Sequence, residues 1–376
     1  MSPSALPKSA PDLHIPKSSS TVTVKVIDRP HTRSQHSGPH RPHIHYPRAR
    51  LPRPLAPPRP LPRLLNRTPI RPQAPLRPRH AQRLAQPRPC LHGHDPRSGP
   101  DVTIQIKKDV AEILQDNNVD VQGGAIEAII WSHWHPDHTG NPALFPPAPP
   151  SSSHNFTPGY PTNPAAPLLD ADFDGRDVKE VAFSDLHIAG FRAHDFFHDG
   201  SFYILDAPGH TIAHICALAR VTSNPDTFIF LGADACHHGA EFRPTAYLPL
   251  PSQINLGALA VPNHADADAC ICPGSMFAKL SPSPTPNTPF YRANQAFAHD
   301  SVEAHETIEK LELFDATPNV WVVIAHDASL LEPDLGVEFF PSGNINSWKE
   351  KGLGEKTRWR FLKDLKRAAE AAQQSM

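Results

Sequence analysis

The stretch SHWHPDHTG, residues 132–140, gathers three histidines and one aspartate within six consecutive positions. These four side chains are His133, His135, Asp137 and His138. The preceding run AIEAIIW, residues 125–131, is apolar and rich in isoleucine, which predicts a buried strand that ends where the cluster begins. The cluster is therefore expected on a loop at the end of a strand. Imidazole and carboxylate groups together suit zinc, with iron and manganese as close competitors.

The number of candidate ligands on this loop favours two ions. A catalytic zinc ion usually takes three protein ligands in all, so four ligands on one short loop exceed the need of a single ion. The alternative is a chance cluster, because the chain contains 24 histidines. The pattern HxHxDH directly after an apolar run is far more specific than one histidine pair, and it favours a metal site.

Three further apolar runs are each followed by a candidate ligand. SFYILDAPGHT (201–211) ends near His210, TFIFLGADAC (227–236) ends near Asp234, and NVWVVIAHDAS (319–329) ends near His326 and Asp327. Each run predicts a strand with the ligand on the loop that follows it. Packing alone does not explain why this arrangement recurs.

In their order HxHxDH, PGHT, GAD and AHD, these motifs resemble the metallo-β-lactamase superfamily of dinuclear metal hydrolases. The resemblance covers roughly residues 101–376, and the wording is similar to the N-acyl homoserine lactonase-like branch, particularly its fungal proteins. It implies an α/β (α+β) fold, a four-layer αββα sandwich with the metals at one edge of the two sheets. It also implies that His133, His135 and His210 hold one ion, that Asp137, His138 and His326 hold the other, and that Asp234 bridges them.

The chemistry that follows is hydrolysis of an ester or lactone bond in a small molecule. A hydroxide shared by two zinc ions, or by iron or manganese, is available at neutral pH because the metals lower the pKa of water. Asp137 is the candidate for orienting that hydroxide and moving a proton. In the lactonase branch a tyrosine lies over the substrate carbonyl three residues after the bridging aspartate, and here that position is His237, which can donate a hydrogen bond to the oxyanion. His238 is interpreted as a neighbour only.

Other functions of the same fold stay open as alternatives. They are a thioester hydrolase of the glyoxalase II type, a phosphodiesterase or nuclease, and a non-catalytic or damaged member of the family. Nucleic acid is not the expected partner.

The composition predicts the cellular setting. No run of 18 or more apolar residues exists, so no transmembrane helix is expected, and the N-terminus lacks the apolar core of a signal peptide. Five cysteines form no even framework, which fits a reducing, cytosolic setting.

The segment 29–100 differs from the rest of the chain. It contains 15 Arg, 18 Pro, 8 His and one acidic residue, and therefore carries about +14, while the whole chain has a net charge of −2. Its prolines deny it helices and inner strands, so we expect it to be disordered. An Arg-rich tail can bind phosphates through charge alone. However, Leu, Pro, His, Gln and Arg, whose codons can begin with C, supply 53 of its 72 residues, and our hypothesis is a frame-shifted or mis-spliced stretch.

The predicted organisation has four parts. We expect a disordered N-terminus (1–20), an isolated first strand TVTVKVID (21–28), the segment 29–100, and a metallo-β-lactamase-like domain (101–376) whose N-terminal sheet is incomplete. Helices are predicted at 109–118, 299–314 and 356–374. His194, His198 and His214 lie near the ligand strands, but alternation places them as readily on a polar face, so they are left out of the site.

Overall fold

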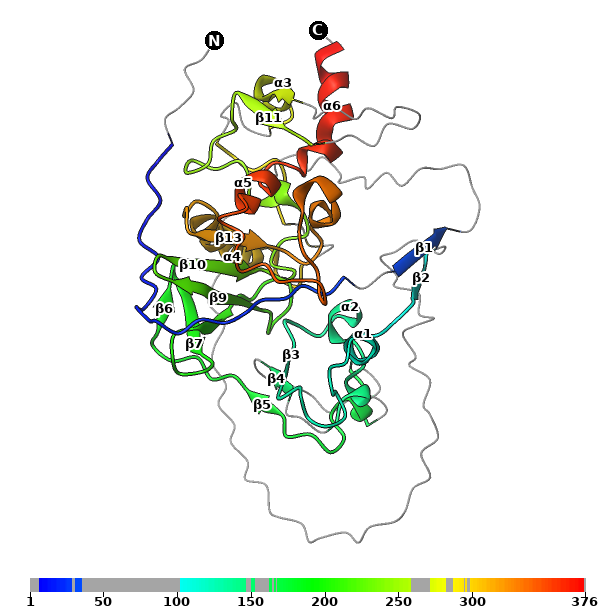
Figure 1. Ribbon diagram of the computed structural model, residues 1–376. Coiled ribbons are helices and arrows are strands. Elements are labelled where there is room, and N and C mark those ends of the chain that lie inside the picture. The colour runs from blue at the N-terminus through cyan, green and yellow to red at the C-terminus, as the bar shows by residue number, and fades with distance from the viewer. Residues whose placement is uncertain are drawn as a thin grey trace, which may run out of the picture. The chain divides into compact units, whose positions relative to one another are not determined.

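The computed structural model divides the chain into two units, Met1–Thr32 with Gln105–Met376, and Arg33–Ile104. The described residues are 7–28, 31–35, 102–146, 150–152, 162–163, 166, 168–257, 271–281, 287–293, 295 and 298–374 (Figure 1). Most of the segment 29–100 lies outside them. Within the described part of the chain, no helix has the length and apolar character needed to cross a membrane.

One short piece of the segment 29–100 is described. It is β1 (His31–Gln35), which pairs with β2 (Val102–Ile106) in a two-stranded sheet. The expectation of disorder for this segment is therefore wrong for β1. The stretch HTRSQ lacks proline, so each of its backbone N–H groups can donate to a ladder.

The largest sheet described has six strands in the order β13-β10-β9-β8-β7-β6. β9 runs antiparallel to both β8 and β10, and β10 runs parallel to β13. Hence β8, β10 and β13 point the same way, and the loops that follow them leave from one edge of the sheet. The strands are β6 (His187–Ile188), β7 (Phe191–Asp195), β8 (Phe202–Asp206), β9 (Ile215–Ser223), β10 (Asp226–Leu231) and β13 (Val320–Val323).

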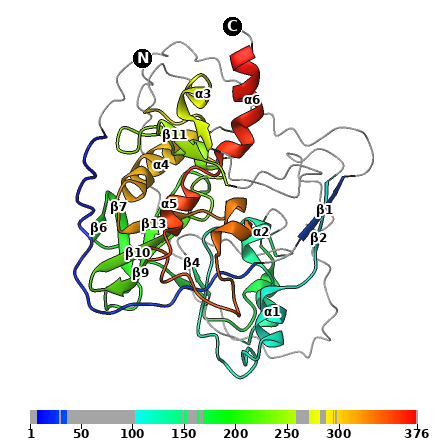
Figure 2. The ribbon, with the colours of Figure 1, turned by 45° about the horizontal axis from the view of Figure 1, so that its top comes forward.

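A helix covers one face of this sheet. α4 (Ser301–Asp315) confirms the helix predicted at 299–314, and it lies alongside the strands (Figure 2). Its Ile308, Leu311 and Phe314 are fully buried, and the Phe314 ring lies 4.7 Å from that of Phe230 in β10. Because side chains alternate along a strand, Phe230 faces α4 while Ile229 packs on the opposite face.

The N-terminal residues 7–28 pack on both faces of the large sheet, and this corrects two expectations. Leu13 is buried in the core under α4, and the Arg220 guanidinium donates to the Pro16 carbonyl, so disorder is wrong for residues 7–20. Residues 21–28 are extended but not assigned as a strand, and they are not isolated. The carbonyls of Val24 and Val26 accept from the backbone of the C-terminal region, and the alternating valines supply one apolar face.

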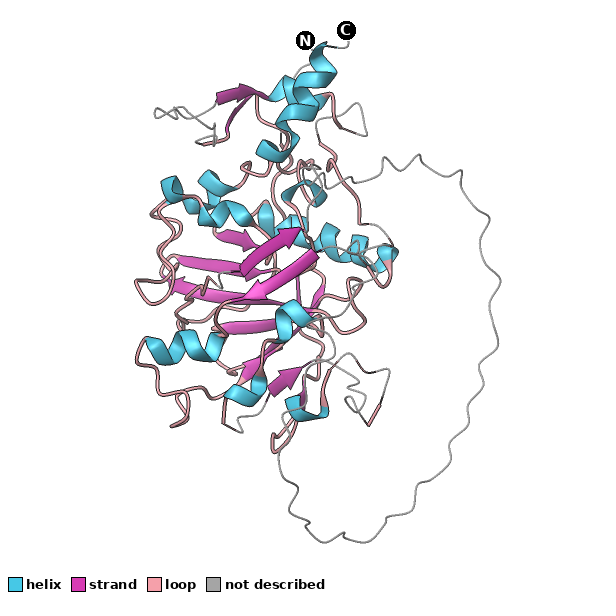
Figure 3. Ribbon diagram, turned by 90° about the vertical axis from the view of Figure 1, so that its right-hand side faces the viewer, coloured by secondary structure: helices cyan, strands magenta, loops and turns pink. Residues whose placement is uncertain are grey.

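The second sheet contains short strands in the order β3-β4-β5, all parallel. They are β3 (Ile129–Ile130), β4 (Pro150–Ser152) and β5 (Lys179–Glu180). Ile130 packs against Ile204 and Ile215 of the large sheet. Strands with helices on both sides are visible in Figure 3, and the mixed sheet with its helices confirms the α+β class. Among the described residues this sheet has fewer and shorter strands than the large sheet.

The C-terminal region packs on an insertion after β10. β11 (Gln253–Asn255), β12 (Ile271–Pro273) and α3 (Gly274–Ala278) share an apolar cluster with α6 (Leu362–Gln374). Leu362, Leu365 and Ala369 form the buried face of α6. The helix predicted at 356–374 is thus interrupted, because α5 (Leu353–Thr357) ends before α6 begins.

The remaining helical elements are short. α1 (Val110–Asp116) confirms the predicted helix at 109–118, and it begins at a capping box formed by Asp109 and Glu112. The others are α2 (Pro136–Thr139), η1 (Pro142–Leu144), η2 (Asp170–Asp172), η3 (Gly239–Glu241), η4 (Ala328–Leu331) and η5 (Pro333–Leu335).

Candidate metal centre

The candidate site lies where β8, β10 and β13 end. The loops after these strands carry His210, Asp234 and His326. The cluster that follows β3 joins them because the Ser132 carbonyl accepts a hydrogen bond of 2.8 Å from the Ile215 backbone N–H at the start of β9. The common direction of β8, β10 and β13, together with the hydrogen bond between Ile215 and Ser132, therefore brings four separate loops to one edge of the large sheet.

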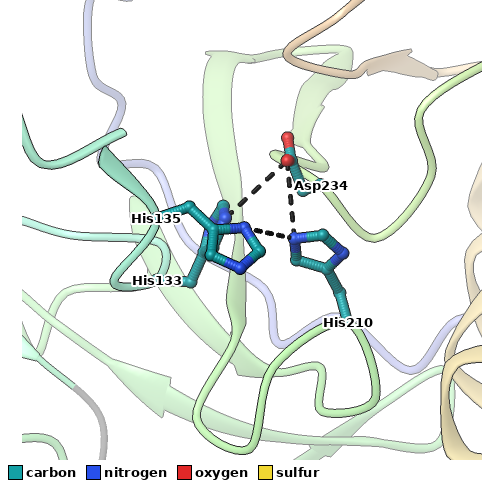
Figure 4. A group of neighbouring side chains, drawn as sticks. All are labelled: His133, His135, His210 and Asp234. Atoms are coloured by element: carbon teal, nitrogen blue, oxygen red, sulfur yellow. Dashed lines mark hydrogen bonds and ion pairs between the residues drawn. The ribbon is translucent and has the colours of Figure 1, made fainter. Parts of the chain in front are cut away.

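Four side chains form the first group of possible metal ligands: His133, His135, His210 and Asp234 (Figure 4). His210 Nε2 lies 2.9 Å from His135 Nδ1 and 3.5 Å from Asp234 Oδ2. His133 Nε2 lies 3.7 Å from the same carboxylate oxygen. The candidate ligand atoms of this group all lie within 4.8 Å of one another.

The second group consists of Asp137, His138, Asp234 and His326. His138 Nε2 lies 3.1 Å from Asp234 Oδ1, and His326 Nε2 lies 3.3 Å from that oxygen. Asp137 Oδ2 lies 3.6 Å from His138 Nε2 and 3.7 Å from His326 Nε2. Asp234 thus belongs to both groups, and all seven residues that the sequence singled out as ligands meet here.

His237 stands beside the shared carboxylate. Its Nε2 lies 3.3 Å from Asp234 Oδ2, and its ring stacks on that of His326 at 5.6 Å. Its backbone N–H donates to the buried Glu241 carboxylate at 3.0 Å. By contrast, His238 contacts Asp364 of α6 at 3.2 Å.

Burial keeps the central histidines neutral. It lowers the pKa of His210 to about 3, and it lowers that of His133 well below the ordinary value. Burial opposes the charged form of Asp234 too, yet the neighbouring histidine side chains outweigh it, and its pKa lies far below the usual range. Burial likewise disfavours charge on His237, but Asp234 prevails and raises the pKa of that imidazole. The neutral imidazoles of His133 and His210, beside an ionised carboxylate, can donate lone pairs to a cation.

The donor set fits a divalent metal. His133 Nε2 is buried and makes no hydrogen bond within the described residues, although a buried polar atom without a partner costs about 1–3 kcal/mol. It faces Asp234 across a gap too wide for a hydrogen bond. Imidazole nitrogens and carboxylate oxygens that converge in this way are typical ligands of zinc, iron and manganese.

Tight turns precede two of the candidate ligands, His210 and Asp234. Gly209 has φ +120°, and a Cβ there would lie 2.1 Å from the Ala304 backbone nitrogen, so glycine is needed before His210. Ala233 has φ +43°, a left-handed conformation that costs a non-glycine residue about 1–2 kcal/mol. Such strain is found mostly at functional sites, and here it lies next to Asp234.

Sequence reasoning missed His214. Its Nε2 accepts a 3.1 Å hydrogen bond from the Asp234 backbone N–H, and its ring lies 5.1 Å from that of His133. His194 and His198 contact each other and belong to neither ligand group. The only local signal for His214 was its place in PGHTIAH, where its contact with the GAD turn cannot be seen.

Comparisons with known proteins give several relatives, although no model of a known family matches the chain. A metallo-hydrolase of Annulohypoxylon moriforme is 41% identical over 271 residues, covering 70% of this chain and 68% of that protein. A gamma-lactamase of Gibberella moniliformis is 37% identical over 218 residues, covering 55% of this chain and 88% of that protein. A Penicillium brevicompactum protein named cytochrome P450 monooxygenase is 41% identical over 279 residues and 71% of this chain, but the match spans 29% of that protein.

Solved structures give a weaker match. An N-acyl homoserine lactone hydrolase with its product at the catalytic metal center covers 65% of this chain and 72% of its own, at 14% identity and a TM-score of 0.40.

Proposed function

The chain belongs to the metallo-β-lactamase superfamily, and we propose that it is a metal-dependent hydrolase. We propose further that it opens a lactone or a related cyclic acyl bond in a small molecule. The observation that carries this proposal is the pair of ligand groups that share Asp234. A γ-lactam ring has nearly the same shape as a γ-lactone ring, and the Gibberella moniliformis relative is named a gamma-lactamase.

We assign the ligands to two ions. His133, His135 and His210 would hold the first ion, Asp137, His138 and His326 would hold the second, and Asp234 would bridge both. Zinc is our first choice, with iron or manganese as alternatives. When bound, a pair of divalent ions lowers the pKa of water and withdraws electrons from the carbonyl under attack.

Asp137 is suited to proton transfer. Its side chain is about half exposed, so it can reach both the site and solvent. Burial works against its charged form, but contact with His138 outweighs this and lowers the pKa of Asp137 to about 2. An ionised carboxylate there can accept the proton of the attacking water and pass it to the leaving oxygen or nitrogen.

His237 is suited to stabilise the oxyanion. It lies beside Asp234 and a quarter of its side chain is exposed (25%), so a substrate carbonyl can approach the ring. Its raised pKa favours the protonated ring, which donates a hydrogen bond as the carbonyl oxygen gains negative charge.

The first test is the metal content of the purified, full-length protein, measured by elemental analysis beside a thermal melt. We expect about two divalent ions per chain, as in other two-metal hydrolases. Asp234→Ala should lose at least one ion, whereas Asp364→Asn, which alters an exposed contact of His238, should keep both. An unchanged metal content in Asp234→Ala would refute the bridging role.

Substrate class is tested with a panel of four acyl and phosphoryl compounds. Turnover of a γ-lactone or γ-lactam by metal-loaded protein is the expected result. Turnover only of a glutathione thioester or of a phosphodiester would replace the proposal by one of the alternative functions. Metal binding without turnover of any substrate would indicate a non-catalytic member of the family.

A further inference from the structure

His214 is fully buried in the loop between His210 and β9, and both of its ring nitrogens are engaged. Nδ1 lies 3.1 Å from the Ala207 carbonyl oxygen. Nε2 accepts a 3.1 Å hydrogen bond from the Asp234 backbone N–H. The ring therefore joins the end of β8 to the turn after β10.

These two partners fix the tautomer of His214. A carbonyl oxygen can only accept, so the proton must be on Nδ1, and a backbone N–H can only donate, so Nε2 must be bare. With both nitrogens occupied, His214 is not available as a metal ligand, although its ring lies 5.1 Å from that of His133.

The turn that carries Asp234 needs such support. Ala233 adopts a left-handed conformation with φ +43°, which is strained for a residue with a Cβ. The flanking bonds come from the neighbouring strand: the Ala325 N–H donates to the Ala233 carbonyl at 2.9 Å, and the Gly232 N–H donates to the Val323 carbonyl at 2.8 Å. The hydrogen bond from the Asp234 N–H to His214 connects this turn to the loop that carries His210.

We propose that His214 is a positioning residue that holds the Asp234 carboxylate between the two ligand groups through the acceptor at Nε2. This inference rests on the proposed metal site, because positioning matters only if Asp234 binds metal. It assigns His214 a role toward the metals without direct contact with them.

The experiment compares two substitutions in the full-length protein. In His214→Gln the side-chain amide reaches the position of Nε2 and can offer an oxygen to the Asp234 N–H. In His214→Asn the shorter amide keeps a donor near the position of Nδ1 and loses the acceptor. Zinc affinity is measured by competition with a chromogenic chelator, and the metal-free proteins are melted in parallel.

We expect His214→Asn to weaken zinc binding by about 10- to 100-fold, as is typical when a partner of a metal ligand is removed. His214→Gln should stay within a few-fold of the parent protein. A merely structural role would lower both melting temperatures and leave the two zinc affinities alike, and that result would overturn the inference. If the unsubstituted protein binds no zinc, the proposed metal site itself fails.

A second measurement reads the tautomer of His214 directly in the parent protein. The imidazole nitrogens of the metal-free parent protein can be observed by long-range proton–nitrogen NMR, with the His214 signal identified by its loss in His214→Gln or His214→Asn. The geometry requires a neutral ring with its proton on Nδ1. A ring protonated on Nε2 instead would contradict the contact with Asp234.

Discussion

Asp234 shows how single residues set the properties of the site. Five histidine side chains lie within 3.7 Å of its carboxylate: His133, His138, His210, His237 and His326. A buried carboxylate keeps its charge only among such partners. Burial keeps the rings of His133 and His210 neutral, which is the state that binds a metal ion.

Substitution of His237 tests the oxyanion role. Phe at this position removes the donor and keeps a ring of similar size, so kcat on the lactone or lactam should fall by about 100-fold. Metal content should not change, because His237 lies outside both ligand groups. Tyr restores an O–H donor and should recover part of the rate. Equal rates for the Phe variant and the parent protein would show that His237 does not act on the oxyanion.

At the scale of elements, the turn after β8 links the sheet to α4. The Gly209 carbonyl accepts from the Asp300 N–H at the start of this helix, and the Asp300 side chain caps the first turn. The His210 carbonyl accepts from the His299 N–H. The position of His210 is therefore coupled to the position of the helix.

Gly209→Ala should disturb this coupling. The added Cβ would collide with the backbone of α4 at Ala304, so the turn must shift and His210 must leave its place. We expect weaker zinc binding and a lower melting temperature. Gly336→Ala is the matched control, because Gly336 also has positive φ (+66°) but a Cβ there meets no atom within 4 Å. Gly336→Ala should lower the melting temperature and leave the zinc affinity unchanged. Similar zinc affinities in Gly209→Ala and Gly336→Ala would contradict the coupling between His210 and α4.

Glu312 makes the stability of α4 depend on pH. Burial, together with the charges of Glu309 and Asp315, raises the pKa of Glu312 to about 8, from an ordinary value of 4.5. The folded state therefore binds this proton more tightly than the unfolded state. The contribution of protonated Glu312 to the free energy of unfolding is fully present below pH 4.5. This contribution is lost as the pH rises from 4.5 through 8.

Glu312→Gln should remove that dependence. Relative to the parent protein, we expect its melting temperature to rise more at pH 9 than at pH 5, by at least the 2–4 °C that roughly 1 kcal/mol produces in a domain of this size. Glu306→Gln, an exposed position on the same helix, should show no such difference. Thermal melts of metal-free protein at both pH values make the measurement. A pH-independent effect of Glu312→Gln would refute a buried neutral carboxyl.

At the scale of the whole molecule, the site residues belong to one unit. All seven candidate ligands lie in the unit formed by Met1–Thr32 and Gln105–Met376. The N-terminal residues 7–28 contribute to its core on both faces of the large sheet. The fold of this unit thus depends on chain that precedes the segment 29–100.

Two deletions test this division. Replacing residues 36–101 by a Gly/Ser linker keeps the described unit intact, and we expect unchanged metal content and a cooperative melt. Deleting residues 1–28 removes Leu13 and the valines that cover the sheet, and we expect a large loss of stability. If the linker protein failed to fold, the segment would be a structural part of the domain.

The origin of the segment 29–100 is a separate question. Our hypothesis of a frame-shifted or mis-spliced stretch predicts that the sequenced transcript will depart from the reading frame of this chain in that region. An unbroken, in-frame message would contradict it. The metal-content measurement is independent of this outcome.

The residues of the two ligand groups could be predicted from the sequence. HxHxDH, PGHT, GAD and AHD each follow an apolar run, and local pattern is enough to predict a strand that ends at a loop. All seven residues chosen in this way meet in the structure, and their role as ligands stays a prediction. The positions of α1 and α4 followed from the same kind of local signal, whereas the α+β class was implied by the resemblance to a known family.

The groups that surround these ligands are visible only in the folded protein. Neither the His214 contact with Asp234 nor the packing of residues 7–28 onto the sheet has a local signature, because each depends on groups that are distant along the chain. Periodicity reports which side chains share a face of one element, but not which element covers that face. The chain contains 24 histidines, and their local sequence does not show which role each one has. Folding gives both ring nitrogens of His214 a hydrogen-bonding partner, and this separates His214, which positions Asp234, from the histidines that can bind a metal.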